Sequence, residues 1–289
     1  MRQLGKIFKK VRESRGLLQK DIICDELSKS HLSRFEKGET DLTISKFVRA
    51  LEGLNLSIDE FFYIVNDFKR NDINDLLIEI QNCFLKDDML NLKKLLLRQE
   101  EKVRKGKAKK FDLLNIILIK IKIKSLSNES DTCPYSEKDI KFLIDYLFSV
   151  EYWGMYELIL FGNTVNVMPY KLCIVLAREM ISRTEVYNEI ASYRKLVASM
   201  TLNTYITCIE KDQLIDALYF EKKLHQFYFK ETEIYERIVF QYAKGFYNYK
   251  KYQSNEAILE MKKSIGLFEL VGSYHLAEQY KKHLQQLFY

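Results

Sequence analysis

Residues 28–38 read Ser28-Lys-Ser-His-Leu-Ser-Arg-Phe-Glu-Lys-Gly38, and this stretch decides how the N-terminal part of the chain folds. Its first residue is a typical N-cap and its last a typical C-terminal stop, so it predicts a helix over residues 29–36. Leu32 and Phe35 fall on one face of that helix, together with the preceding Leu27. The outward face carries short hydrogen-bond donors and long cations: Lys29, Ser30, Ser33, Arg34 and Lys37. Such a face suits the major groove of DNA, and a solvated helix surface is the alternative.

The sequence on either side predicts four more short helices. Residues 2–14 repeat apolar side chains at the spacing of an amphipathic helix, and Gly16 stops it. Further helices are expected over residues 19–24, 44–51 and 58–64. Thr43 is expected to cap the second of these three, and Ser57-Ile58-Asp59-Glu60 is a capping signal for the third.

Five short helices with a turn between the second and third resemble the helix-turn-helix of phage-repressor-type (XRE) regulators. The resemblance rests on Arg12, Arg15-Gly16, Gln19 and the frame of residues 28–38. It implies that Arg12, Arg15 and Gln19 hold DNA phosphates, Gln19 with the help of a helix N-terminus. The full DNA-binding set that it implies is Arg12, Arg15, Gln19, Lys29, Ser30, His31, Ser33, Arg34 and Lys37.

Three positions in this region leave the geometry or the role open. Ile23 stands where the XRE pattern usually has a small Ala, and Asp25-Glu26 replaces the usual turn Gly. The crossing of the second and third helices is therefore less certain than their existence. His31, at the edge of the reading helix, is either a packing residue or a phosphate contact.

Composition and charge bound the class of protein. The chain has 289 residues, of which 47% are hydrophobic and 30% charged, which excludes a disordered chain, collagen and a disulfide scaffold. Only two prolines favour long helices joined by short turns. The net charge is +6, with +5 in residues 1–37 and −3 in residues 38–66, and the basic part suits a polyanionic partner. Two domains are expected, residues 1–66 and residues 67–289.

Several classes of function lack their sequence signals. Cations interrupt the apolar pattern of residues 1–11, which argues against a secretion signal, and residues 113–123 are too interrupted to span a bilayer. Five widely spaced cysteines (Cys24, Cys83, Cys133, Cys173 and Cys208) fit reduced thiols and give no zinc pairing. No phosphate-binding loop, zinc-protease motif or nucleophile elbow is present. We therefore expect a cytoplasmic protein without cofactor, metal, membrane partner or enzymatic activity.

From residue 67 onward, apolar residues recur at helical spacing almost without interruption. Successive helices in pairs with short turns predict an α-solenoid, and residues 242–257 resemble a tetratricopeptide unit. The earlier pairs match that consensus poorly, so the array is tetratricopeptide-like, with about 271–288 as a terminal capping helix. The expected helices are about 72–84, 89–104, 111–125, 137–149, 153–163, 169–183, 187–208, 211–227, 231–250, 253–270 and 273–288.

A repressor-type domain joined to such an array resembles the Rgg (GadR/MutR) regulators of the peptide-sensing RRNPP group of Gram-positive bacteria. The most specific stretches are Leu32-Ser-Arg-Phe-Glu-Lys-Gly38, Thr43-Ile-Ser-Lys-Phe47, and residues 146–163 with Tyr152-Trp-Gly-Met-Tyr. The resemblance implies a homodimeric transcription factor whose concave solenoid face holds a short, mostly apolar signalling peptide. The peptide-contacting positions that it implies are Asn163, Tyr187, Tyr193, Asn203, Tyr235 and Arg237.

Alternatives remain open at this point. For each tyrosine of the peptide set taken singly, a core residue is the favoured interpretation, and Asn163 and Asn203 are alternatively turn or cap residues. The solenoid is alternatively a ligand-independent dimerisation or partner scaffold, or a groove of an enzyme or phosphatase regulator. The basic run from Arg98 to Lys110 is either a solvated turn or a contact with DNA that flanks the operator.

Overall fold

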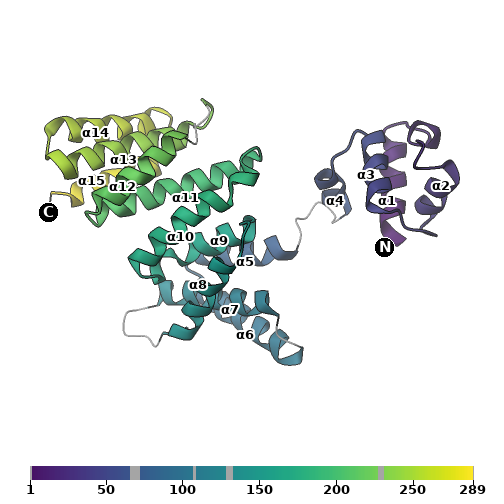
Figure 1. The fold of residues 1–289 in the computed structure, drawn as a ribbon, viewed down its shortest axis with the longest axis horizontal. Helices are drawn as coiled ribbons and strands as arrows, with labels where there is room; N and C mark the ends of the chain where they lie inside the picture. Colours follow the sequence, from purple (N-terminus) through teal and green to yellow (C-terminus); the bar gives the residue numbers. More distant parts are fainter. Residues whose placement is uncertain (1, 66–71, 107–108, 128–132, 227–230, 289) are drawn as a thin grey trace. The chain divides into compact units, whose positions relative to one another are not determined.

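The computed structural model describes residues 2–65, 72–106, 109–127, 133–226 and 231–288, and the described residues are helical without a strand (Figure 1). An all-α fold is confirmed. The chain divides into two compact units, Met1–Asp88 and Met89–Tyr289. The domain boundary expected after residue 66 lies outside the described residues. Among the described helices, none combines the length and apolarity needed to cross a bilayer.

The first unit contains four helices around one apolar core. These are α1 (Arg2–Ser14), α2 (Lys29–Lys37), α3 (Ile44–Gly53) and α4 (Ile58–Val65), followed by α5 (Asp72–Leu85). The core is built on Phe8, Leu27, Leu32, Leu51 and Phe61, each at most 1% exposed. The predicted anchoring of α2 through Leu27 and Leu32 is therefore confirmed.

A glycine sets how closely α1 crosses α2. A Cβ atom placed on Gly5 would lie 1.7 Å from the carbonyl oxygen of Phe35, far inside van der Waals contact. Any side chain at this position would push α2 away from α1. Gly5 therefore allows the close crossing of α1 and α2.

The predicted helix caps of the first unit are present. Ser28 accepts a hydrogen bond from the backbone N–H of His31, and Gly38 ends α2 in the left-handed conformation. Thr43 accepts from the N–H of Lys46 at the start of α3. Ser57 and Glu60 form a reciprocal capping box, whose hydrogen bonds lower the pKa of Glu60. These local signals therefore place α2, α3 and α4.

The helix expected over residues 19–24 is wrong. Only Gln19–Asp21 forms a single 3₁₀ turn, η1, where the carboxylate of Asp21 accepts from the N–H of Leu18 at 2.7 Å. Cys24 and Leu27 then pair through their backbones, which replaces the rest of the helix. Ile22 is buried against Gly53, where an added Cβ would lie 3.3 Å from the Ile22 Cα, whereas Ile23 is exposed. Burial of one isoleucine in this tight space ends the turn early.

The second unit is a chain of helices joined by short turns. It comprises α6 (Met89–Lys105), α7 (Lys110–Leu126), α8 (Glu137–Ser149), α9 (Met155–Thr164), α10 (Tyr170–Arg183), α11 (Ala191–Glu210), α12 (Leu214–Gln226), α13 (Ile234–Tyr252), α14 (Asn255–Leu270) and α15 (Tyr274–Gln286), with 3₁₀ turns η2 (Val165–Val167) and η3 (Glu185–Tyr187). The predicted helices 187–208 and 231–250 each begin about three to four residues later than expected. Before α11 the chain instead forms η3 and an extended Ile190.

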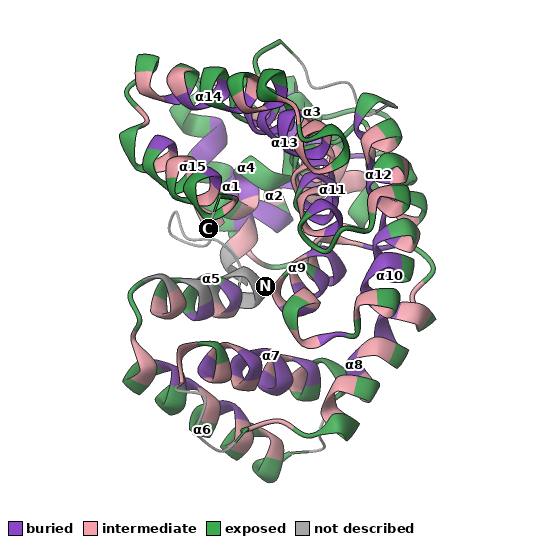
Figure 2. Cartoon of the chain, turned by 90° about the vertical axis from the view of Figure 1, so that its left-hand side faces the viewer, coloured by how far each residue is buried: buried purple, intermediate pink, exposed green. Residues whose placement is uncertain are grey.

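Alternate helices form an inner row. α7 packs on α9, α9 on α11, and α11 on α13, while α6, α12 and α14 pair with their neighbours in sequence. Figure 2 shows the buried residues that run along α7, α11 and α13. We refer to α7, α9, α11 and α13 as the inner row. This arrangement is the pairwise stacking expected for an α-solenoid.

The α13–α14 pair has the close packing of a tetratricopeptide unit. A Cβ on Gly245 would lie 2.9 Å from Met261 Cγ and 3.1 Å from the Ala257 carbonyl oxygen. Ala243 and Ala257 are buried beside this crossing. Small residues therefore allow the two helices to approach, as the sequence of residues 242–257 predicted.

Candidate nucleic-acid interface and inner row

The outward face of α2 presents the predicted polar row to solvent. Lys29, Ser30, Arg34 and Lys37 are exposed, and His31 and Ser33 are half-buried. Arg34 lies 3.9 Å from the carboxylate of Glu39, in a pair that is more than half exposed on both sides. A weak exposed pair of this kind leaves the guanidinium free to exchange partners. The geometry thus offers a helix with mobile cations and short donors on one face.

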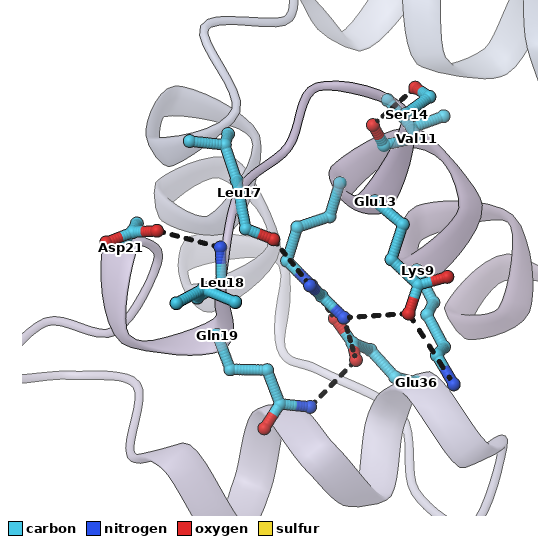
Figure 3. Close-up of polar contacts among 10 residues, drawn as sticks. Lys9, Val11, Glu13, Ser14, Leu17, Leu18, Gln19, Asp21 and Glu36 are labelled. Atoms are coloured by element: carbon cyan, nitrogen blue, oxygen red, sulfur yellow. Dashed lines mark hydrogen bonds and ion pairs between the residues drawn. The ribbon is translucent and has the colours of Figure 1, made fainter.

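Arg12 has a different environment from the one predicted. It is 6% exposed, and its Nε and Nη2 donate to the carboxylate of Glu36 at 2.7 and 3.0 Å. Its Nη1 donates to the carbonyl of Leu17 at 2.6 Å, and the hydrogen bond with Glu36 raises the pKa of Arg12. Figure 3 shows this network between α1, the following turn and α2. A phosphate contact would require the guanidinium to leave Glu36, and in this structure Arg12 ties α1 to α2.

The other two predicted phosphate ligands also hold the turn. Gln19 Nε2 donates to Glu36 at 2.8 Å, and Gln19 points toward that carboxylate in Figure 3. Arg15 donates from Nη1 to the carbonyls of Leu54 and Asn55, which ties the end of α1 to the end of α3. Both side chains keep exposed surface, because Gln19 is half-buried and Arg15 exposed. They therefore remain accessible at the edge of the unit while serving the fold.

Two predicted peptide positions meet at the start of α11. Tyr187 and Tyr193 stack with ring centroids 4.6 Å apart. The hydroxyl of Tyr193 accepts from the N–H of Met155, which connects α11 to the first turn of α9 at 3.2 Å. Both rings are half-buried. This pair forms a rigid aromatic platform between two helices of the inner row.

Two other predicted positions lie in the first turn of α13. Tyr235 and Arg237 are exposed, and Arg237 lines a small pocket of about 240 Å³ with Ile234 and Leu267. Ion pairs join this end of α13 to the start of α11, Arg194 with Glu233 at 3.9 Å and Lys195 with Glu236 at 3.4 Å. The starts of the two helices are therefore held together.

The asparagines lie farther along the inner row. Asn203 is exposed in the middle of α11. Asn163, near the end of α9, donates its amide N–H to the carbonyl of Ile159 in its own helix at 2.7 Å. The amide oxygen of Asn163 and the whole amide of Asn203 are thus the groups offered to a ligand. A side-chain amide of this kind matches the N–H and C=O of an extended peptide backbone.

Sequence reasoning missed other polar groups of the inner row. Tyr156 on α9 donates to Asn115 on α7 at 2.9 Å. Glu157 is buried, where it accepts from Tyr146 and from the N–H of Gly154 at 2.9 Å, and this contact together with burial raises the pKa of Tyr146. Tyr156 and Asn115, like Tyr146 and Glu157, lie on different helices, so spacing gave no signal for these two contacts, whereas the Gly154–Glu157 contact is a local cap of α9.

The cysteines and potential metal ligands form no candidate site. The five cysteines are unpaired, and burial raises the pKa of Cys173 and Cys208 to about 11, which makes them poor nucleophiles at neutral pH. Within the described ranges, no group of three or more His, Cys, Asp or Glu side chains is arranged to hold a metal ion.

Comparison with known sequence families places both units. The family described as "HTH-type transcriptional regulator Rgg, C-terminal domain" matches residues 93–282, which is about two thirds of the chain. A helix-turn-helix family matches residues 8–61. The first match covers α6 to α15 nearly completely, and the second covers α2 and α3 with parts of α1 and α4.

Solved structures agree with these matches. The Streptococcus dysgalactiae SHP pheromone receptor Rgg2 is 28% identical with a TM-score of 0.85, over 98% of this chain and 99% of that one. A candidate transcriptional regulator from Listeria monocytogenes EGD-e is 22% identical with a TM-score of 0.85, over 98% and 96% of the two chains. The PrgX/cCF10 complex, at 17% identity over 99% and 92% of the chains, has a TM-score of 0.72 and shares the fold.

Proposed function

This chain belongs to the Rgg family of helix-turn-helix transcriptional regulators, and we propose that a short, mostly apolar signalling peptide controls it from the inner row. The chain is a DNA-binding regulator with an N-terminal helix-turn-helix. The observation that carries the proposal is the half-buried amide of Asn163 on α9 and the exposed amide of Asn203 on α11, together with the stacked Tyr187–Tyr193 pair at the start of α11. The related Rgg2 structure is that of a pheromone receptor, which supports a peptide as the ligand class.

On the DNA side, α2 is the reading helix. Lys29, Ser30, Ser33 and Arg34 would contact base edges, because they lie on the face opposite the buried Leu32 and Phe35. Arg15, Gln19, His31 and Lys37 would approach the phosphates from the edges of the same surface. A homodimer would place two such helices one or a few helical turns apart, roughly 34 Å per turn.

Replacing Arg34 tests the reading helix. Arg34→Ala should cost about 1–3 kcal/mol of specific DNA binding and relax the preference at one base pair. The measurement is the affinity for a duplex that the full chain selects from a random-sequence library, with each base of the site then varied. Arg49→Ala on α3 is the matched control, because it removes an equally exposed cation outside α2. Unchanged affinity and base preference for Arg34→Ala would exclude Arg34 from base readout.

On the peptide side, the amides of the inner row would hold the backbone of the ligand and the aromatic pair its apolar side chains. Asn163 and Asn203 would pair with backbone N–H and C=O groups, whereas Tyr187, Tyr193, Tyr235 and Arg237 would line the ends of the site. Backbone recognition explains how one scaffold can accept apolar peptides of differing sequence.

Native mass spectrometry with a pool of synthetic short apolar peptides tests this site. We expect saturable binding that Asn163→Ala and Asn203→Ala weaken while DNA binding without peptide stays unchanged. Asn255→Ala on α14 is the control, since its exposed amide lies outside the inner row. Absence of any saturable peptide would favour a ligand-independent regulator whose repeat unit is a dimerisation or protein scaffold.

The switch would be a shift of populations between two arrangements of a cytoplasmic homodimer. The peptide must bind one arrangement more tightly than the other, because equal affinity moves no equilibrium. The protein would act by binding DNA and peptide, with no catalytic step. Equal loss of peptide and DNA binding in the asparagine variants would show that these residues are structural instead.

A further inference from the structure

The largest concentration of positive charge lies outside the helix-turn-helix. Residues 1–66 hold twelve Lys or Arg against ten Asp or Glu, a net charge of +2. Residues 89–127, which form α6, α7 and their connection, hold twelve Lys or Arg against three acids, a net charge of +9. This segment alone exceeds the +6 of the whole chain. A polyanion would therefore be attracted more strongly to this hairpin than to the reading domain.

The cations nearest the connection of α6 and α7 lie on the surface of the hairpin, whereas Lys120, Lys122 and Lys124 farther along α7 are half-buried. α6 and α7 pack on each other through buried residues such as Leu92, Leu95, Leu114 and Ile117. The cations that follow one another toward and after the connection of the two helices are all exposed: Lys102, Arg104, Lys105, Lys109 and Lys110. These five exposed cations lie at the connected ends of α6 and α7, and we call them the hairpin tip.

Few acidic groups neutralise the hairpin tip. Lys105 pairs with Glu101 at 3.5 Å, with both side chains largely exposed. Lys102 lies 3.5 Å from Asp112, but Asp112 also accepts from the backbone N–H of Lys109 at the start of α7. The exposed Lys105–Glu101 pair contributes little stability and exchanges readily with other anions, and Asp112 divides its carboxylate between Lys102 and the helix start. The tip is therefore better suited to an external anion than to stabilising its own fold.

We propose that the hairpin tip binds the phosphate backbone of duplex DNA that flanks the base pairs read by α2. Exposed lysines act as point charges, which suits sequence-independent phosphate contacts better than readout of base edges. α6 begins at Met89, the first residue of the second unit, so the tip belongs to the part of that unit nearest in sequence to the helix-turn-helix. Binding of an operator by the first unit would raise the local concentration of DNA around the tip.

Counter-ion release gives this proposal a quantitative readout. Each phosphate that a cation contacts adds about 0.9 to the slope of log affinity against log salt concentration. The test variant is the triple Arg104→Gln, Lys105→Gln and Lys109→Gln, which leaves the Lys102–Asp112 pair intact. The matched control is Lys222→Gln, Lys263→Gln and Lys282→Gln, three exposed cations on α12, α14 and α15.

The probes are two duplexes that carry the site selected by the full chain, one just long enough for the site and one extended by about one helical turn on each side. We expect the wild type to bind the longer duplex more tightly, and the hairpin variant to lose that gain. Its salt slope on the longer duplex should fall by about 1–3, whereas the control variant keeps the wild-type slope. Binding of the short duplex should be nearly unchanged, which separates the tip from α2.

Three results would overturn the proposal. One is a hairpin variant with the wild-type slope and the wild-type gain from flanking DNA. Another is an equal loss of salt slope and of the gain from flanking DNA in the control variant, which would show that the effect depends only on the net charge of the protein. The third is unchanged DNA binding with loss of binding to vesicles containing anionic lipid or to a single-stranded RNA. None of these results depends on a peptide, so they test the hairpin tip independently of the proposed peptide site.

Discussion

The two units of this protein fix their structures by different means. In the first unit, short-range signals set three helices: Ser28 and Thr43 cap α2 and α3, Gly38 ends α2, and Ser57 caps α4. In the second unit, many helices lack a side-chain cap and are placed by apolar contacts between neighbours along the inner row. The difference teaches that a reading helix needs one defined position, whereas a stacked array tolerates small shifts at each junction.

The largest effect is expected at the crossing of α1 and α2. Gly5→Ala would force a Cβ to within 1.7 Å of a backbone oxygen, and backbone cannot move aside as a side chain can. We expect the first unit to lose about 3–5 kcal/mol of stability. Hydrogen exchange in the full chain should show deprotection of α1 and α2 with α13 unchanged. Wild-type protection of α2 in this variant would show that the crossing adapts. It would contradict the claim that the first unit is less tolerant of shifts than the second.

The next largest effect is expected at the buried ion pair. Glu36→Gln removes the charge that compensates Arg12, and breaking a buried pair from one side costs about 3–5 kcal/mol. Denaturant unfolding should show this loss, and the double variant Arg12→Leu with Glu36→Leu should recover most of it. An unchanged stability accompanied by tighter DNA binding would instead mean that Glu36 withholds Arg12 from phosphate.

A smaller effect is expected at the matching crossing in the second unit. Gly245→Ala meets the flexible Met261 side chain at 2.9 Å before it meets backbone, so we expect a loss of about 1–3 kcal/mol. Gly266→Ala, within α14 and with open space around it, should stabilise by about 0.5–1 kcal/mol. Thermal unfolding of the Gly245→Ala and Gly266→Ala variants measures these two changes in stability. A Gly245→Ala cost as large as that of Gly5→Ala would remove the distinction between the two units.

The smallest effect concerns His283 on α15. Burial lowers the pKa of His283, although Glu210 at 3.8 Å opposes this, and Tyr242 hydrogen-bonds its Nδ1 at 2.8 Å. The unfolded chain therefore binds the proton more readily than the folded chain. Stability should fall as the pH drops below about 6.5 toward the lowered folded value. The measurement is the slope of unfolding free energy against pH, which His283→Gln should flatten; equal slopes would contradict the assignment.

Local chemistry explains what the sequence predicted well. The bounds of α2 follow from caps at both of its ends, the start of α4 follows from the Ser57–Glu60 capping box, and the outward row of α2 follows from helical spacing against buried Leu32 and Phe35. The Rgg resemblance, based on short stretches in both units, is confirmed by a family match over residues 93–282.

Contacts between residues far apart in the sequence explain what the sequence analysis missed. Arg12 appeared as a phosphate ligand because its partner Glu36 lies 24 residues away. The helix expected over residues 19–24 failed because Ile22 is buried against Gly53 on another helix. For the peptide positions, the family resemblance pointed to Tyr187 and Tyr193, but the hydrogen bond from the N–H of Met155 to the Tyr193 hydroxyl depends on how α9 and α11 pack. Tertiary packing of this kind leaves no periodic trace in the sequence.

The order of contacts along the inner row has a mechanical consequence. Because α7, α9, α11 and α13 pack in series, small rotations at successive junctions add up along the array, so the array can bend and twist as one elastic body. A ligand that touches several of these helices at once would couple the junctions and make the array of helices stiffer. Such stiffening changes the free energy of the whole array even when no single helix moves far. Elasticity would then carry a signal along the repeat unit.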